Sequence, residues 1–116
     1  MPKATHVTLP LTRAELARLR HRAGEASTLL KALSNENRLL ILCTLADTEL
    51  SVSELQARIG MSQSSLSQQL AILRREGFVM TRREAQTIYY SLASSDALQV
   101  IELLHDLYCG GGRKGR

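Results

Sequence analysis

Residues 51–77, with the sequence SVSELQARIGMSQSSLSQQLAILRREG, constrain the fold more than any other part of the chain. Ser51 and Glu54 form a capping box that starts a short helix, and Gly60 ends that helix. Ser62 starts a longer helix, and Gly77 occupies the position where helices often end in the left-handed conformation. Two helices separated by so short a turn predict a helix-turn-helix.

The hydrophobic period changes to two directly after this pair of helices. The stretches FVMTRR and TIYYSL, within residues 78–92, are rich in β-branched and aromatic residues and flank the loop Glu84-Ala85-Gln86. This pattern predicts a β-hairpin. A basic hairpin that follows a helix-turn-helix is typical of the wing of a winged helix-turn-helix. We therefore expect a mainly α-helical chain with a β-hairpin wing, in the α+β class.

Two further helices are expected before this unit. Thr12 and Glu15 predict a capping box for a first helix, which Gly24 is expected to break or bend. After Ser34-Asn35, a second helix is predicted over residues 37–46. It is apolar on most sides and should therefore be central and buried.

Length and charge set the class of protein. The 116 residues suit one domain, and 15 basic against 11 acidic residues give a net charge of +4, which permits nucleic-acid binding. We assign residues 1–11 to a flexible arm, 12–109 to the DNA-binding and dimerisation domain, and 110–116 to a disordered basic tail.

The longest apolar run is too short to span a bilayer, and no secretory signal is recognisable. A cytoplasmic protein with reduced thiols and no membrane partner is expected.

The second helix of the helix-turn-helix presents a face suited to DNA. Leu66, Leu70 and Leu73 form one apolar stripe, and the opposite side is small, polar and free of acidic residues. Gln can pair with adenine, and Ser can donate to a base or a phosphate. Such a face alone fits solvated surface equally well, but the basic hairpin favours double-stranded operator DNA. The predicted DNA-binding residues are Gln63, Ser64, Ser65, Ser67, Gln68 and Arg75 from the helix, and Arg82, Arg83 and Gln86 from the hairpin.

The last helix is the main candidate for dimerisation. Ser94 or Ser95 caps it, and it ends near Cys109. Its sequence, DALQVIELLHDLY, carries more apolar surface than packing of one side requires. We expect the first and last helices to form a homodimer, so that two recognition helices read half-sites about one helical turn apart.

Three stretches together resemble the ArsR-type winged-helix repressors over nearly the whole predicted domain: LLKALSNENRLLIL, SVSELQARIGMSQSSLSQQLAILRREGFV and the hairpin end IYYSL. The resemblance implies a homodimer that represses promoters and leaves DNA when an inducer binds. Many members sense metals, so the family's two common metal sites need to be compared with this chain.

Neither metal site is retained in the sequence. Where one site has a Cys-x-Cys pair, this chain has Ser51-Val52-Ser53, and hydroxyl groups are poor ligands for soft metals. Where the other has Asp-x-His and a second His on the last helix, this chain has Asp96, Leu98 and Cys109. A carboxylate and a thiol do not complete a tetrahedral site. We expect no metal and no other cofactor.

The two cysteines are open to two interpretations. By spacing alone, Cys43 is a small hydrophobic residue of the core, and Cys109 is an incidental residue on the polar face of Glu102 and Asp106. The resemblance implies more. A subgroup of these repressors senses persulfides and polysulfides through cysteines at both positions, which sulfur joins within one subunit as a di-, tri- or tetrasulfide. Reactive sulfur species would then be the inducer, and Cys43 and Cys109 the sensing thiols.

Three alternatives remain open. Two adjacent thiols also form a plain disulfide with a general oxidant such as peroxide. A metal-responsive repressor could use both cysteines with a histidine. A thiol enzyme has less support, because the chain lacks a Cys-x-x-Cys motif or a Cys/His pairing typical of catalysis, so no catalytic residue is assigned.

Overall fold

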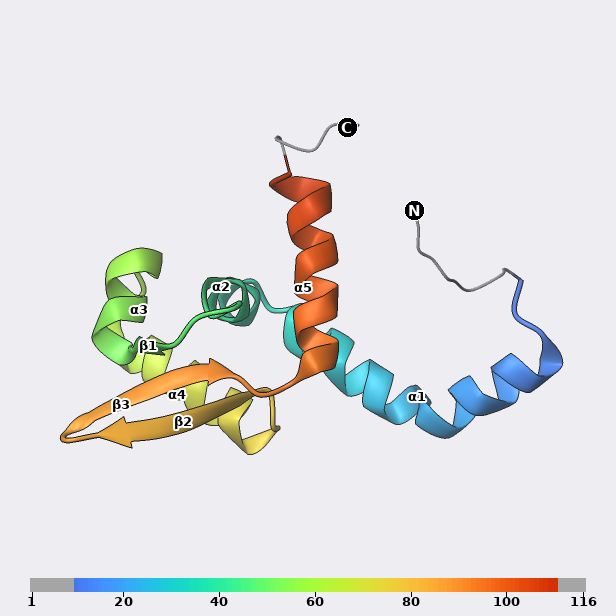
Figure 1. Cartoon of the computed structure of the whole chain (residues 1–116), viewed down its shortest axis with the longest axis horizontal. Coiled ribbons are helices and arrows are strands. Elements are labelled where there is room, and N and C mark those ends of the chain that lie inside the picture. The colour runs from blue at the N-terminus through green and yellow to red at the C-terminus, as the bar shows by residue number, and fades with distance from the viewer. Residues whose placement is uncertain (1–9, 111–116) are drawn as a thin grey trace. The chain divides into compact units, whose positions relative to one another are not determined.

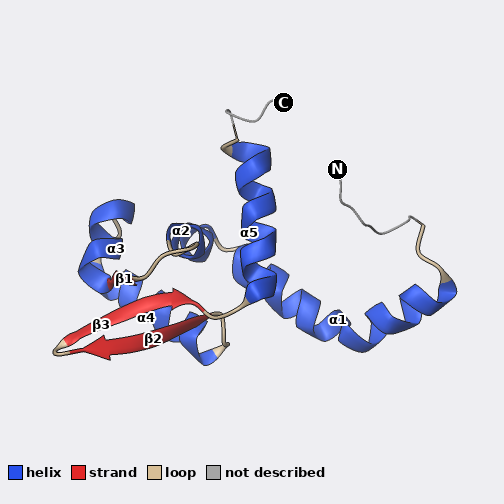
Figure 2. Cartoon of the chain, in the orientation of Figure 1, coloured by secondary structure: helices blue, strands red, loops and turns tan. Residues whose placement is uncertain are grey.

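The computed structural model describes residues 10–110. The predicted arm, residues 1–11, and the predicted tail, residues 110–116, lie almost wholly outside the described residues. The chain divides into two compact units, Met1–Lys31 and Ala32–Arg116. The helices and strands, shown in Figures 1 and 2, are α1 Arg13–Leu33, α2 Glu36–Thr44, β1 Leu50–Ser51, α3 Val52–Ile59, α4 Gln63–Arg75, β2 Val79–Glu84, β3 Thr87–Leu92 and α5 Ser95–Tyr108.

Helix α1 begins at the predicted capping box. The backbone N–H of Thr12 donates to Glu15 Oε1 (2.8 Å), and the N–H of Glu15 donates to Thr12 Oγ1 (3.1 Å). The helix continues through Gly24 and bends along its course (Figure 1), so of the two outcomes expected at Gly24, a break or a bend, the break does not occur. The Thr28 hydroxyl donates to the Gly24 carbonyl (3.0 Å), a contact that often accompanies bending.

Helix α2 is shorter and more open than predicted. Asn35 caps it by accepting a hydrogen bond from the Arg38 N–H (3.1 Å). Ile41 and Leu42 are fully buried, whereas Leu40 is 50% exposed and Cys43 is exposed. The expectation that this helix is buried on most sides is therefore wrong. One side packs into the core, and the other is left open.

The helix-turn-helix forms as predicted. Ser51 and Glu54 make both hydrogen bonds of the capping box that starts α3, and Gly60 ends it at φ 88°. The Ser62 hydroxyl caps α4 by accepting from the Ser65 N–H (3.1 Å). Gly77 follows α4 at φ 84°, a conformation that costs glycine little because it lacks a Cβ.

The wing is a hairpin in a three-stranded antiparallel sheet of order β1-β3-β2. Glu84 pairs with Thr87, so the loop is Ala85-Gln86 alone, one residue shorter than predicted. Strand β1 was not predicted, because two residues are too few to show a period. It pairs with β3 at Leu50 and Tyr90, and so connects the middle of β3 to the start of α3.

The core joins the helix-turn-helix to α2 and α5. Its largest fully buried side chains are Ile41, Leu42, Leu45, Leu55, Leu66, Leu70 and Leu73. Ala97 and Ile101 contribute from α5, which the Ser94 hydroxyl caps by accepting from the Ala97 N–H (3.0 Å). Among the helices of residues 10–110, none is long and apolar enough to cross a membrane.

Candidate nucleic-acid interface and thiol groove

Helix α4 has one anchored face and one free face, as the sequence predicted. Leu66, Leu70 and Leu73 are fully buried and fix its rotation about its own axis. The first turn carries no acidic residue, so the helix N-terminus can face a phosphate without charge repulsion. The residues predicted on the opposite side are Gln63, Ser64, Ser67, Gln68 and Arg75, which are exposed, and Ser65, which is half-buried.

Arg82 in the wing is held by two carboxylates. Its Nη2 lies 2.8 Å from Glu49 Oε1 and its Nη1 2.9 Å from Glu84 Oε1, while the guanidinium carbon lies 4.9 Å from the ring centroid of Tyr89. The hydrogen bonds from Arg82 lower the pKa of Glu49 below its usual range. These contacts connect the segment before β1 with both strands of the hairpin. No sequence pattern indicated Glu49 as a partner, because 33 positions separate the two residues.

The other predicted wing residues, Arg83 and Gln86, are exposed. Within residues 10–110, the Arg83 side chain makes no hydrogen bond or ion pair, so its positive charge is available to a ligand. Gln86 and Gln63 line one shallow polar groove of about 280 Å³ together with residues of β1 and α3. The structure thus brings the tip of the wing beside the start of α4 and joins the two predicted DNA-binding segments in one surface.

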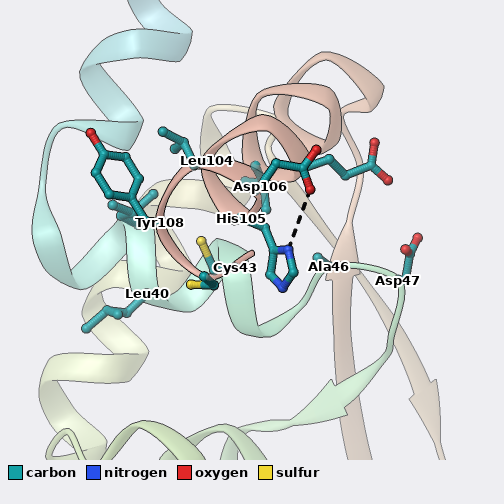
Figure 3. A pocket seen from close by; sticks show the side chains of 12 residues that line it. Leu40, Cys43, Ala46, Asp47, Leu104, His105, Asp106 and Tyr108 are labelled. Carbon is teal, nitrogen blue, oxygen red and sulfur yellow. Dashed lines mark ion pairs between the residues drawn. The ribbon is translucent and has the colours of Figure 1, made fainter. Parts of the chain in front are cut away.

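A second and larger groove lies between α2 and α5 (Figure 3). It has a volume of about 730 Å³ and is lined by residues of these helices and of the turn after α2. Cys43 and Cys109 both line it, and both are exposed free thiols. Cys109 caps the end of α5, where its N–H donates to the His105 carbonyl (2.8 Å). The predicted sensing thiols therefore share one groove, and Cys43 is not a core residue.

The surroundings of Cys43 disfavour a negative charge. Partial burial raises the pKa of the Cys43 thiol, and the neighbouring Cys109 raises it further. The second effect means that the two sulfur atoms lie within electrostatic reach of each other. The Cys43 thiol therefore becomes a better nucleophile as the pH rises, since the thiolate is the reacting form.

The rest of the groove combines apolar walls with acidic side chains. Leu40, Leu104 and Tyr108 lie around the Cys43 thiol, and Asp47 lies beyond Ala46 (Figure 3). His105 Nδ1 lies 3.9 Å from Asp106 Oδ1, an ion pair only when the imidazole is protonated. The described residues contain no cluster of three or more His, Cys, Asp or Glu side chains that could hold a metal ion.

Comparison with known proteins identifies the family. Residues 35–81 match the model described as bacterial regulatory protein, arsR family. Over 94 residues the chain is 55% identical to the transcriptional activator HlyU of Vibrio cholerae, covering 81% of this chain and 87% of HlyU. The chain belongs to the ArsR family. Two solved structures agree with this ArsR-family assignment. Reduced HlyU from Vibrio cholerae has a TM-score of 0.75 and 55% identity, and the match covers 79% of this chain and 97% of that chain. The transcriptional repressor BigR from Xylella fastidiosa has a TM-score of 0.76 and 42% identity, and the match covers 85% of this chain and 98% of that chain.

These ArsR-family relatives fix the general function. The protein is a winged-helix transcriptional regulator and not an enzyme, as the sequence predicted. The relatives include both an activator and a repressor. The free face of α4, the wing and the groove with two thiols are the features from which a more specific function can be argued.

Proposed function

We propose that this regulator is a repressor whose affinity for operator DNA is switched by a sulfur link between Cys43 and Cys109. The observation that carries the proposal is that both cysteines are free, exposed and part of the same groove. They come from different helices, so a link between them ties α5 to α2. One of the similar solved structures is that of reduced HlyU, which supports testing thiol oxidation in this chain as well.

The chemistry requires no cofactor when a polysulfide is the inducer. With hydrogen trisulfide, the Cys43 thiolate attacks the middle sulfur atom and HS⁻ leaves. The Cys109 thiolate then attacks the same sulfur atom and displaces a second HS⁻. The two thiols are oxidised, the two outer sulfur atoms are reduced to sulfide, and the middle atom remains as the centre of a trisulfide. A di- or tetrasulfide retains fewer or more inner sulfur atoms.

Operator DNA would be bound by α4 and the wing. Gln68, Ser64 and Gln63 face outward where a major groove would lie, and Arg75 stands at the far end of the same face. Arg83 and Gln86 would follow the backbone or the minor groove, with Arg82 holding the shape of the wing. The two segments border one surface, which supports a single continuous DNA contact.

A homodimer through α1 and α5 would position two such surfaces. Five of the seven exposed leucines of the described chain lie on these two helices: Leu16, Leu19 and Leu30 on α1, and Leu103 and Leu107 on α5. Apolar surface of this extent is more stable when a partner covers it. Since α5 would belong both to the dimer and to the thiol groove, a link to α2 would change the distance between the two recognition helices. DNA that fits one spacing would then be released.

The same thiols would also react with a general oxidant. Peroxide would give a plain disulfide with no additional sulfur, and the shared groove supports that reaction equally. The proposal of a reactive-sulfur sensor therefore needs a test that identifies the atoms in the link.

The test begins with reduced protein kept free of oxygen. One sample is treated with polysulfide and one with hydrogen peroxide, and intact and peptide masses are measured. We expect a cross-linked Cys43–Cys109 peptide carrying additional sulfur after polysulfide. Affinity is then measured for DNA selected from a random pool by the reduced protein. Cys43→Ser and Cys109→Ser should retain that affinity but no longer respond. Two free, unmodified thiols after polysulfide would refute the sulfur switch.

A further inference from the structure

We infer that the groove between α2 and α5 admits uncharged, apolar sulfur donors, such as dialkyl trisulfides and higher polysulfides, in preference to anionic ones. The inference rests on the proposed thiol switch and specifies the chemical class of its inducer. It follows from the side chains that surround the two thiols, and each contribution can be changed without touching either cysteine.

The walls of the groove are apolar. Leu39, Leu40, Ile101, Leu104 and Tyr108 contribute to its lining. Leu40 is 50% exposed and Tyr108 is 80% exposed, so water covers apolar surface that a ligand would bury. Removing such surface from water is favourable and increases with the length of an alkyl chain. A sulfur donor with alkyl ends is therefore concentrated beside the thiols.

The charges around the groove are negative. Asp47, Glu102 and Asp106 all line it, and no lysine or arginine is among its described lining residues. Among these described lining residues, the one basic side chain is that of His105, whose Nδ1 lies 3.9 Å from Asp106 Oδ1. The carboxylates of Asp47 and Glu102 reduce the local concentration of an anion, and this effect weakens as salt screens it.

The reaction with an uncharged trisulfide, R–S–S–S–R, balances without another reagent. The Cys43 thiolate attacks the middle sulfur atom and expels RS⁻. The Cys109 thiolate attacks that sulfur atom, now bound to Cys43, and expels the second RS⁻. The products are a Cys43–S–Cys109 trisulfide and two molecules of RSH, which take up the two thiol protons.

The experiment compares reagents that share this reactive core and differ only at their ends. Reduced full-length protein is mixed with dipropyl trisulfide, bis(2-hydroxyethyl) trisulfide or bis(2-carboxyethyl) trisulfide. The rate of link formation is read from intact mass after acid quenching. Each rate is divided by that of the same reagent with 2-mercaptoethanol, which removes differences in intrinsic reactivity.

We expect the normalised rate to fall from the propyl to the hydroxyethyl to the carboxyethyl reagent. At low salt the normalised rates of the uncharged reagents should exceed that of the dianionic carboxyethyl reagent by about tenfold or more. A salt concentration of about 0.5 M should reduce that ratio. The difference between propyl and hydroxyethyl should survive salt, because burial of apolar surface does not depend on charge screening.

Two substitutions isolate the carboxylates. Asp47→Asn is tolerated by the turn, since Asn also adopts the left-handed conformation found there (φ 58°). Glu102→Gln changes an exposed helical position. Together they should accelerate the carboxyethyl reagent several-fold and leave the propyl reagent unchanged. Glu36→Gln removes a carboxylate on α2 outside the groove and serves as the matched control, with no expected change.

The outcomes separate this inference from the proposed function. If the carboxyethyl reagent reacts as fast as the uncharged ones after normalisation, or if Asp47→Asn with Glu102→Gln has no effect on it, the inducer class is wrong. A link formed by every reagent would leave the thiol switch intact in that case. If no reagent forms a link, both the switch and the inducer class are refuted.

Discussion

Arg38 in α2 donates a hydrogen bond from Nη1 to Oε1 of Gln69 in α4, over 3.3 Å. Its Nε also donates to the carbonyl of Ala32 (3.2 Å). Arg38 belongs to the same helix as Cys43, and Gln69 belongs to the helix that presents Gln68 to DNA. The two helices that the proposed switch must couple therefore share a polar contact as well as the packed core.

Replacing Arg38 should weaken the coupling between the groove and DNA. Arg38→Met keeps much of the aliphatic stem and removes the hydrogen bonds to Gln69 and to the Ala32 carbonyl, whereas Gln69→Leu removes the first of these alone. One such bond contributes about 1 kcal/mol, so the ratio of DNA affinities between the reduced and linked forms should fall by roughly fivefold. The measurement is Kd for both forms, with Gln69→Leu as the matched change on the other helix. An unchanged ratio in both variants would show that the contact does not transmit the switch.

The face of α4 assigned to DNA can be tested at Gln68. Gln68→Ala should weaken binding to the selected DNA by about 1–3 kcal/mol if the side chain contacts a base. Gln99→Ala, an exposed glutamine on α5, is the control and should have no effect. Both affinities are measured by titration at one salt concentration. Equal affinities for the two variants would mean that another face of α4 enters the groove.

The two wing arginines should differ in their salt dependence. Arg83→Ala should reduce the slope of log K against log salt by about 0.9, because one phosphate contact is lost. Arg82→Ala should leave the slope nearly unchanged, since Glu49 and Glu84 already neutralise Arg82. Affinities at four or more salt concentrations provide both slopes. A fall in slope for Arg82→Ala alone would reverse these roles and make Arg82 the phosphate contact.

Local signals in the sequence were sufficient for most of the fold. Ser51 and Ser62 cap the helices that they were predicted to cap, and Ser94 is the one of the two candidate serines that caps α5, because a hydroxyl beside free N–H groups acts over three residues. The period of Leu66, Leu70 and Leu73 likewise located the buried side of α4, and so its free face.

Features that depend on distant parts of the chain were not predictable. Leu40 is as apolar as Leu42 but half exposed, because the packing of α2 against α3 and α4 decides which side of α2 is buried. No repeat or spacing in the sequence predicts the ion pair between Arg82 and Glu49. The position of Cys109 in the same groove as Cys43 was implied by family resemblance, whereas spacing alone favoured unrelated positions.

The wing turn carries a strained residue. Ala85 adopts φ 56°, a left-handed conformation that costs a residue with a Cβ about 1–2 kcal/mol. Ala85→Gly should remove that cost but increase the entropy of the unfolded chain, giving a net stabilisation of about 0.5–1 kcal/mol. Urea denaturation measures the change, and Ala57→Gly, in the exposed middle of α3, should instead destabilise by about 1 kcal/mol. A destabilising Ala85→Gly would mean that the turn gains more from the methyl group than it loses.

The pH dependence of Cys43 reactivity follows from its raised pKa. A raised thiol pKa means a smaller thiolate fraction at any pH below it, so alkylation should continue to accelerate with pH after a free thiol has reached its plateau. The experiment uses Cys109→Ser, in which Cys43 is the single thiol and burial, the larger cause of the shift, remains. Iodoacetamide rates are measured from pH 7 to 11 beside N-acetylcysteine. The quantity compared is the pH at which the rate reaches half its maximum, and not the rate itself, because steric shielding slows alkylation equally at every pH. In urea this midpoint pH should return to that of N-acetylcysteine. If the folded protein already has the same midpoint pH as N-acetylcysteine, the groove does not disfavour the thiolate.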